Sequence, residues 1–495
     1  MDDMYDLLIV GGGINGTAIA RDAAGRGLSV LLCEKDDLAS HTSSASTKLI
    51  HGGLRYLEYY EFKLVRDALI EREVLLRSAP HIIWPMRFIL PYDEGLRPAW
   101  MLRLGLLLYD NLGGRKLLPG TKKVNLEDPE HQGILKDRLK IGFEYSDCWV
   151  DDARFVVLNA MDAREKGADI RTRTEVINMW PEDDHYGANI RDAEGERAVR
   201  AKGIVNAAGP WVEKILIDIQ PDENDAGMRL IKGSHIVVPK LFEGEHAYMF
   251  QNADNRIIFA IPYEQKFTLI GTTDVPQAEQ TAEISQEEIE YLCQSANEYL
   301  KKDISPDDVV WSYSGVRPLY DDKSENASAV TRDYVLDIDE FATKAPFMSI
   351  YGGKITTSRK LAQHAMKELK PYFSYDRKSW TAKGILPGGN IKDANFDDFF
   401  EKLSRKYPWM QAGNLRRMAR AYGTHITKIL GEAKSISDLG QHFGGGLTEA
   451  EVRYLREHEW ARAPRDVLWR RSKLGLHMTQ AERDAFSKWF LAFQA

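Results

Sequence analysis

Three glycines near the start of the chain have a spacing suited to binding phosphate groups. Gly11, Gly13 and Gly16 follow the apolar run 5–10 and precede an alanine-rich stretch, 17–26, that reads as a helix. In such a strand–turn–helix the first glycine permits the tight turn, the second lets backbone N–H groups approach a pyrophosphate, and the third lets helix and strand pack closely. The helix N-terminus adds roughly half a positive charge near the phosphates. The spacing predicts a dinucleotide-binding loop, although glycines before a helix also occur simply as turn residues.

An acidic residue stands where the ribose of such a dinucleotide would lie. Glu34 ends the second apolar run, 28–33, and follows Gly16 by 18 residues. A carboxylate at this point accepts hydrogen bonds from a ribose diol and would repel the 2′-phosphate of NADP. With strand, helix and acid all in place, the unit predicts a bound NAD or FAD and does not distinguish between the two.

The rest of the chain alternates helical and strand-like segments. Apolar spacing predicts helices over 61–78, 151–166 and 356–369. Two segments rich in strand-forming residues and turns, 229–275 and 309–338, predict an antiparallel sheet. The chain therefore combines a parallel α/β unit with a separate antiparallel part.

The last hundred residues differ from the rest. A Pro-Gly-Gly sequence at 387–389 reads as a linker, and residues 393–495 read mostly as helices. We expect this tail to pack against the first domain or to form a homodimer interface. Its sequence shows no chemistry of its own.

Composition excludes several classes of protein. The 495-residue chain carries 66 basic and 74 acidic residues, and the resulting net charge of −8 argues against nucleic acid as a partner. Cys33, Cys148 and Cys293 form no CxxC pair and no two histidines have HxxxH spacing, which argues against a disulfide framework and a metal site. The acidic residues 1–4 predict no secretory signal, and no apolar run approaches the ~18 residues of a membrane span. We expect a cytoplasmic protein, soluble or peripheral.

A longer set of motifs resembles one enzyme family. Residues 42–58 read TSSASTKLIHGGLRYLE, and further matches recur in order along the chain. They are FEYSD at 143–147, VDDAR at 150–154, RLIKGSHIV at 229–237, GTTD at 271–274, YSGVRPL at 313–319, TRDY at 331–334, GGKITT at 352–357 and LWRR at 468–471. Together they resemble the FAD-dependent glycerol-3-phosphate dehydrogenases, the aerobic quinone-linked bacterial enzymes among the D-amino-acid-oxidase-like flavoproteins. The resemblance implies FAD rather than NAD as the cofactor.

The resemblance also implies an α/β fold in three parts. These are a discontinuous, Rossmann-like FAD-binding domain of the D-amino-acid-oxidase-like type, an antiparallel-sheet substrate (cap) domain, and a C-terminal helical domain. The expected ranges are 1–80, 150–215 and 340–385 for the first, 81–149 and 216–339 for the second, and 390–495 for the third.

By the same resemblance, FAD contacts residues from several segments. The Gly-Gly-Lys-Ile-Thr turn at 352–356 precedes a helix, so its N–H groups could stabilise the anionic reduced flavin; taken alone, it reads as a simple glycine-rich turn. The expected cofactor-binding residues are Gly11, Gly12, Gly13, Ile14, Asn15, Gly16, Glu34, Ser43, Ser44, Lys48, Leu49, Ile50, His51, Asn206, Ala207, Gly209, Gly353, Lys354, Ile355 and Thr356.

The reaction implied is oxidation of sn-glycerol 3-phosphate to dihydroxyacetone phosphate, with a hydride passing from C2 to the flavin. A dianionic substrate calls for arginine and lysine around its phosphate. By resemblance the pocket is formed by Arg55, Tyr56, Arg317, Arg332 and Lys354, and Arg317 and Lys354 also take part in catalysis.

The alcohol proton must pass to a base, and His235 is the candidate. An imidazole with a pKa near neutrality suits proton abstraction, and His235 lies in the RLIKGSHIV motif. The alternative is that His235 only packs within its strand. His51 is a competing base and could instead contact the flavin.

The electron acceptor implied is a membrane quinone. A glycerol-3-phosphate oxidase that uses oxygen is the alternative, and the chain lacks the added central segment that such oxidases usually carry. An amine or amino-acid oxidase would need a pocket for only one carboxylate. A flavin-binding redox sensor would not react with the substrate.

Segment 84–120 has the composition of a membrane contact. It combines tryptophan, leucine and tyrosine with five basic residues. Such a segment can lie on an anionic lipid surface, here the cytoplasmic face of the inner membrane, or form an ordinary buried helix with snorkelling arginines.

Overall fold

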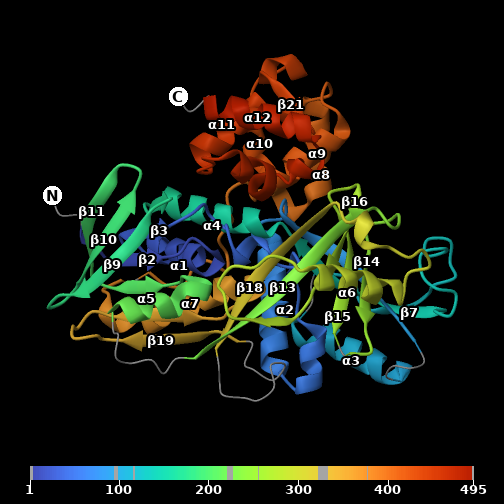
Figure 1. Ribbon diagram of the computed structural model, residues 1–495, viewed down its shortest axis with the longest axis horizontal. Helices are drawn as coiled ribbons and strands as arrows, with labels where there is room; N and C mark the ends of the chain where they lie inside the picture. The colour runs from blue at the N-terminus through green and yellow to red at the C-terminus, as the bar shows by residue number, and fades with distance from the viewer. Residues whose placement is uncertain are drawn as a thin grey trace.

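A six-stranded, mostly parallel sheet organises the first part of the fold. The structure, a computed structural model, describes residues 4–93, 98–114, 117–219, 227–254, 256–320, 333–375 and 377–492. The strand order is β19-β20-β12-β2-β3-β8 (Figure 1). The strands are β2 (Leu7–Val10), β3 (Val30–Glu34), β8 (Asp169–Thr172), β12 (Ile204–Asn206), β20 (Phe347–Tyr351) and the antiparallel edge strand β19 (Val335–Asp339). The predicted Rossmann-like unit is confirmed.

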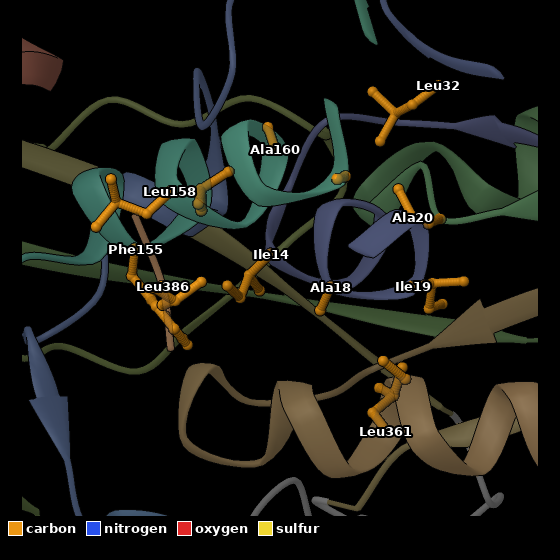
Figure 2. Packing of buried hydrophobic residues seen from close by; sticks show 14 of the residues in the cluster. Ile14, Ala18, Ile19, Ala20, Leu32, Phe155, Leu158, Ala160, Leu361 and Leu386 are labelled. Carbon is orange, nitrogen blue, oxygen red and sulfur yellow. The ribbon is translucent and has the colours of Figure 1, made fainter. Parts of the chain in front are cut away.

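Three helices form one core beside this sheet. Alanine-rich α1 (Ile14–Gly25) packs between α4 (Asp152–Glu165) and α7 (Ser358–Glu368). Figure 2 shows side chains of α1 facing those of α4 and α7. The small alanines of α1 let the neighbouring helices approach closely, so the turn before α1 is held firmly in place.

A second, four-stranded sheet covers the other face. Its order is β1 (Met4–Tyr5), β11 (Gly195–Ala201), β10 (Tyr186–Asp192) and β9 (Glu175–Pro181). Side chains of β9, β10 and β11 share a core with those of β2, β3 and β12. Helix α5 (Val212–Ile219) contacts β9 and β20. The parallel strands are therefore buried on both faces, which accounts for their continuous apolar sequences.

A ten-stranded sheet forms the second domain. Its path is β17-β13-β16-β15-β14-β5-β7-β4, with β18 paired to β13 and β6 paired to β7. The strands are β4 (Leu49–Ile50), β5 (Ile83–Pro91), β6 (Lys122–Asn125), β7 (Ile141–Val150), β13 (Met228–Pro239), β14 (Ala247–Gln251), β15 (Ile257–Tyr263), β16 (Phe267–Gly271), β17 (Val275–Gln277) and β18 (Trp311–Tyr320). All pairs are antiparallel except β5–β14, which confirms the predicted antiparallel domain.

Three further helices accompany the ten-stranded sheet. They are α2 (Phe62–Ser78), α3 (Ala99–Leu112) and α6 (Gln286–Asn297), and α6 begins with a capping box between Ser285 and Glu288. The helices predicted at 61–78 and 151–166 are confirmed to within a residue at each end by α2 and α4. Within the described ranges, no helix is both long enough and apolar enough to cross a bilayer.

Two strands lie across the domain boundaries expected from the sequence. β4 falls in the range 1–80 but pairs with β7 of the ten-stranded sheet. β19 falls in the range 216–339 but pairs with β20 of the six-stranded sheet. Both strands follow the connections between the domains, where a linear division of the sequence cannot show which sheet supplies the hydrogen bonds.

The C-terminal domain is helical and has its own core. It contains α8 (Phe396–Lys406), α9 (Ala412–Tyr422), α10 (Ile426–Leu430), α11 (Glu449–His458), α12 (Gln480–Ala492) and a short hairpin of β21 (His442–Gly444) and β22 (Leu447–Thr448). Figure 1 shows it in orange and red, next to α4. Arg154 of α4 and Glu459, both fully buried, form an ion pair across the contact. The predicted helical domain is confirmed, and it packs on the first domain.

Candidate active site

One cavity of about 1310 Å³ extends from the glycine loop to the ten-stranded sheet. At one end it is lined by the loops after β2 and β3. At the other end it is lined by the 55–59 segment, the β14–β15 hairpin and β18. The cavity therefore joins the predicted dinucleotide site to the predicted substrate site.

The glycine loop has the close backbone packing that its sequence predicts. Gly11 has φ +112°, and a Cβ there would lie 2.5 Å from the carbonyl oxygen of Ala207. A Cβ on Gly16 would lie 2.0 Å from the carbonyl oxygen of Gly11. Gly13 and Ile14 line the cavity, and the N–H of Ile14 donates to Ser43 Oγ at 3.0 Å. The backbone at the start of α1 is thus exposed to a ligand in the cavity.

Glu34 lies at the edge of the cavity beside this loop. Its Oε2 accepts a hydrogen bond from the N–H of Gly12 at 2.6 Å, and its Oε1 accepts one from the N–H of Asp36 at 2.8 Å. Burial raises the pKa of Glu34 to about 7, although these two N–H groups lower it in part. Each oxygen keeps a further lone pair that can accept a hydrogen bond from a ribose hydroxyl.

Two turns face the glycine loop from other parts of the chain. Ala207 and Gly209 line the cavity after β12, and Asn206 Nδ2 donates to the carbonyl of Val212. Gly353 (φ +94°) lines it after β20.

Asn15 joins the glycine loop to the turn after β20. Its Nδ2 donates to the carbonyl of Gly352 at 3.1 Å, while its Oδ1 is buried and has no hydrogen-bond partner. The glycine positions, the exposed start of α1 and this unpaired oxygen fit a bound dinucleotide.

Basic side chains gather at the other end of the cavity. Lys354 Nζ lies 4.0 Å from the centroid of the Tyr56 ring. Arg55 Nη2 donates to the Tyr59 hydroxyl at 3.2 Å. Arg317 Nη2 contacts Asp274 Oδ1 at 2.6 Å, which occupies only part of its guanidinium. Arg55, Tyr56, Arg317 and Lys354 all line the cavity, as predicted for a phosphate pocket. Arg332, also expected here, lies outside the described residues.

His235 lies behind the cavity lining rather than in it. It is 2% exposed, and its ring stacks on Tyr313 with the centroids 4.8 Å apart. Nε2 is 3.0 Å from Thr47 Oγ1, and Nδ1 has no hydrogen-bond partner. Burial lowers the pKa of His235 well below its ordinary value, with a further contribution from Lys48 and Arg317. The imidazole is therefore neutral at physiological pH.

His235 nevertheless shares a face of β13 with the basic cluster. Alternate residues of a strand point to the same side, so Gly233 and His235 do so. A Cβ on Gly233 would lie 3.0 Å from Arg317 Nη2. The His235 ring is thus beside the strand position that contacts Arg317.

Several residues expected to bind the cofactor are occupied elsewhere. Lys48 is 1% exposed, pairs with Asp152 at 2.8 Å and donates to the carbonyl of Ser44. Leu49 and Ile50 form β4 and are buried. The expected residues that are not among those lining the cavity are Gly12, Gly16, Ser44, Lys48, Leu49, Ile50, His51, Asn206, Ile355 and Thr356.

His51 lies close to the basic cluster. Burial, with a smaller contribution from the charges of Lys354 and Arg72, lowers its pKa to about 4. Its backbone N–H donates to Thr356 Oγ1 at 3.3 Å. His51 is therefore a second neutral imidazole near Lys354.

The structure also brings in residues that sequence reasoning did not single out. Arg256 and Asp274 line the basic end, and Lys35 and Trp211 line the other end, where Lys35 Nζ lies 4.0 Å from the Trp211 ring. Asp274 ends the GTTD motif, so the sequence signal that could have identified it is its place in that motif. Arg256 stands alone between turns, and no pattern identifies it. Among the residues described, no group of histidine, cysteine and carboxylate side chains is arranged to hold a metal ion.

Comparison with known proteins agrees with this geometry. Residues 6–340 match the model of the family described as FAD dependent oxidoreductase, and residues 379–491 match the C-terminal domain of alpha-glycerophosphate oxidase. The chain is 53% identical to a D-erythritol 1-phosphate dehydrogenase of Brucella abortus, over 98% of this chain and 97% of the relative. It is 52% identical to a glycerol-3-phosphate dehydrogenase of Pseudomonas tolaasii, over 97% and 94%.

The fold also matches a solved structure over nearly the whole chain. The glycerol-3-phosphate dehydrogenase of Bacillus halodurans, complexed with FAD, superimposes with a TM-score of 0.76 at 26% identity, over 99% of this chain and 94% of that one. The glycine loop, Glu34 and the two facing turns line the cavity and fit this cofactor. The chain belongs to the FAD-dependent oxidoreductase family, carries the C-terminal domain of the alpha-glycerophosphate oxidases, and uses FAD as its cofactor.

Proposed function

We propose that the enzyme oxidises sn-glycerol 3-phosphate to dihydroxyacetone phosphate and passes the electrons to a membrane quinone. The observation that carries this proposal is the single cavity with the glycine loop at one end and Arg55, Arg317 and Lys354 at the other. A phosphate dianion needs several charge-assisted hydrogen bonds, and this cluster supplies them. Bound FAD supplies the hydride acceptor.

Arg317 and Lys354 hold the substrate phosphate in this proposal. Asp274 and the carbonyl of Thr273 fix one nitrogen of Arg317, which leaves its remaining N–H groups for the phosphate oxygens. Lys354 follows the Gly352–Gly353 turn, so its ammonium group is placed by the same segment that faces the glycine loop. Arg332 is retained as an additional phosphate ligand on the basis of its motif.

A neutral imidazole takes the alcohol proton. Bound FAD would supply the acceptor for the C2 hydride, and the base would take the hydroxyl proton, so that the C2–O bond becomes a carbonyl. We retain His235 as the base on the basis of its motif; its ring is unprotonated and its Nδ1 has no hydrogen-bond partner, although the lowered pKa makes it a weaker base than an ordinary imidazole. Because His235 lies behind the cavity lining, the alcohol proton can reach its ring only through the Thr47 hydroxyl or after a small movement of residues 271–274. His51, neutral and near Lys354, is the alternative base.

D-Erythritol 1-phosphate is the second candidate substrate. It is a four-carbon polyol phosphate, and the relative named for its oxidation is 53% identical to this chain. The same basic cluster would bind its phosphate, and a cavity of about 1310 Å³ has room for FAD and either polyol. The two substrates differ by one CHOH group. The part of the cavity between the phosphate and FAD must therefore distinguish one substrate from the other.

Steady-state kinetics with both polyol phosphates tests the substrate. We expect kcat/KM for sn-glycerol 3-phosphate to exceed that for D-erythritol 1-phosphate, with a ubiquinone analogue as acceptor. A reversed order would assign the enzyme to the four-carbon substrate. Stoichiometric peroxide in the absence of quinone would favour the alternative acceptor, oxygen.

The quinone acceptor leads us to propose a peripheral position on the cytoplasmic face of the inner membrane. Helix α3 exposes apolar side chains along one side, with Trp100 65%, Leu104 51% and Leu107 58% exposed. Arg103 is exposed on the same helix, whereas Arg87 of β5 pairs with Glu144 at 3.0 Å. Apolar and basic side chains together favour an anionic lipid surface. The other basic residues of segment 84–120, Arg97, Arg115 and Lys116, lie outside the described residues.

A further inference from the structure

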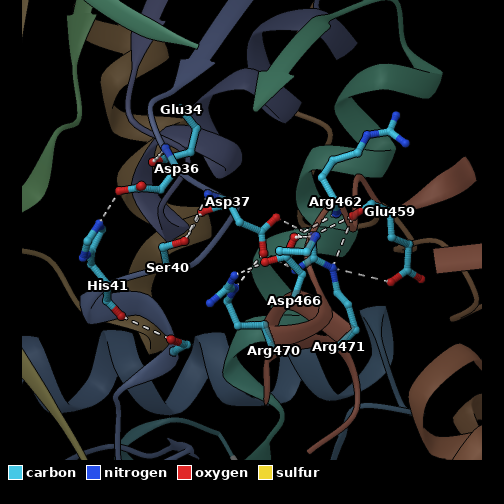
Figure 3. A network of polar contacts seen from close by, with 12 residues as sticks. Glu34, Asp36, Asp37, Ser40, His41, Glu459, Arg462, Asp466, Arg470 and Arg471 are labelled. Carbon is cyan, nitrogen blue, oxygen red and sulfur yellow. Dashed lines mark hydrogen bonds and ion pairs between the residues drawn. The ribbon is translucent and has the colours of Figure 1, made fainter. Parts of the chain in front are cut away.

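The loop after β3 connects the cavity to the C-terminal domain. On one side it lines the cavity through Glu34, Lys35, Ser40 and His41. On the other side Asp37, in the middle of the same loop, is 1% exposed and contacts residues of the C-terminal domain (Figure 3). One short loop is therefore shared between cofactor site and helical domain.

Two consecutive arginines of the C-terminal domain hold Asp37. Arg471 makes a bidentate contact, with Nη1 2.6 Å from Asp37 Oδ2 and Nη2 2.8 Å from Oδ1. Arg470 Nε lies 2.6 Å from Asp37 Oδ2. Burial alone would raise the pKa of Asp37, yet the two arginines hold it below its ordinary value. The carboxylate is thus ionised and fixed in one geometry.

The arginines are themselves fixed by the C-terminal domain. Arg471 donates through Nε and Nη2 to the carbonyl oxygen of Glu459, at 3.2 and 2.6 Å. Arg470 pairs with Asp466. Each guanidinium therefore contacts both Asp37 and a second group of the C-terminal domain, which fixes Asp37 relative to that domain.

A second connection reaches the same loop. Asp466 contacts Arg173 Nη2 at 2.8 Å, and the backbone N–H of Arg173 donates to the carbonyl of Asp36 at 2.8 Å. The N–H of Asp36 in turn donates to Glu34 Oε1, and Asp36 Oδ2 lies 2.9 Å from His41 Nε2, from which it can accept a hydrogen bond. Both connections converge on the residues beside the Glu34 carboxylate.

We propose that Arg470 and Arg471 are positioning residues for the adenosine half of FAD. By fixing Asp37 they hold the 34–41 loop in the conformation in which Glu34 can accept hydrogen bonds from the ribose. The C-terminal domain then sets the affinity of the chain for its cofactor, although none of its described residues, up to 492, lines the cavity. This role does not depend on which polyol phosphate is oxidised.

Cofactor binding by the full-length apoprotein tests the proposal. We expect Arg471→Gln to raise the Kd for FAD by about fivefold or more, and to raise the Kd for ADP, which carries only the adenosine half, by a similar factor. Arg471→Lys keeps the charge and loses the bidentate contact. Its Kd values for FAD and ADP should lie between those of Arg471→Gln and those of the parent protein. Hydrogen exchange of residues 35–41 should be faster in Arg471→Gln.

A matched control separates this role from general stability. Arg164 Nη2 donates to the carbonyl of His458 at 2.9 Å, so it also links α4 to the C-terminal domain but does not contact the 34–41 loop. Arg164→Gln should lower the melting temperature of the apoprotein without changing either Kd. If Arg471→Gln does not fold, Arg470→Gln replaces it as the test. This variant leaves Arg471 paired with Asp37, so its Kd values for FAD and ADP should rise by a smaller factor. Unchanged Kd values for FAD and ADP, or an equal rise in Arg164→Gln, would overturn the proposal.

Discussion

The ammonium group of Lys354 lies 4.0 Å from the centre of the Tyr56 ring. Lys354 follows the turn after β20 in the six-stranded sheet, whereas Tyr56 belongs to the HGGLRY segment near the ten-stranded sheet. The cation–π contact orients a lysine that the cavity leaves open to a ligand. The basic end of the cavity is thus assembled from both domains.

Replacement of Lys354 by alanine should weaken substrate binding. Loss of one charge-assisted contact to a phosphate corresponds to a rise in KM of about ten- to a hundredfold. Lys360 is the matched control, because it pairs with Asp67 outside the cavity. Lys360→Ala should leave KM unchanged. Equal KM values for Lys354→Ala and the parent enzyme would remove Lys354 from the phosphate pocket.

His235→Asn should separate proton transfer from cofactor binding. If His235 is the base, kcat falls by about 10²- to 10⁴-fold while the FAD content of the purified enzyme stays the same. His364→Asn, on the exposed side of α7, serves as the control. Near-normal turnover in His235→Asn would transfer the role to His51, and His51→Asn would then be the variant with the reduced kcat.

The affinity of the apoprotein for FAD should depend on pH. The pKa of Glu34 is about 7 without ligand. Ribose hydroxyls donate to the ionised carboxylate and stabilise it, so binding lowers this pKa and releases a proton. Affinity is therefore greatest above pH 7 and falls as the pH drops below 7, by at most about tenfold per unit. Titration of the apoprotein with FAD at several pH values between 5.5 and 8.5 measures this dependence of the Kd on pH.

Glu34→Gln provides the control for that titration. A glutamine cannot titrate, so the affinity of this variant for FAD should be lower and nearly independent of pH in the same range. A parent protein whose Kd stays constant from pH 5.5 to 8.5 would contradict the assignment of Glu34 to the ribose.

Helix α3 should carry the contact with lipid. Liposome flotation with anionic vesicles should recover the parent enzyme, and replacing Trp100, Leu104 and Leu107 together by serine should lower the bound fraction about tenfold through lost apolar burial. Leu491→Ser, at a residue of the C-terminal domain that is 58% exposed, is the control. Flotation of the triple variant equal to that of the parent would place the lipid contact elsewhere.

The local parts of the site could be predicted from the sequence, and the long-range pairings could not. Gly11, Gly13, Gly16 and Glu34 are predictable because the turn, the helix and the strand that position them lie within one short segment. The sequence does not predict that Lys48 is buried against Asp152 of α4, a partner 104 residues away.

The same limit applies to the domains. The placement of β4 and β19 depends on which of two sheets supplies their hydrogen bonds. The contact of the LWRR motif with the loop after β3 joins residues more than 400 positions apart. Neither the periodicity of the apolar residues nor any other local pattern in the sequence predicts such contacts.

Anaerobic titration of the purified enzyme tests the central claim most directly. The account predicts a yellow protein whose visible flavin absorbance bleaches when sn-glycerol 3-phosphate is added and returns when a ubiquinone analogue follows. A protein that binds no FAD, or one that stays yellow with both sn-glycerol 3-phosphate and D-erythritol 1-phosphate, would contradict it.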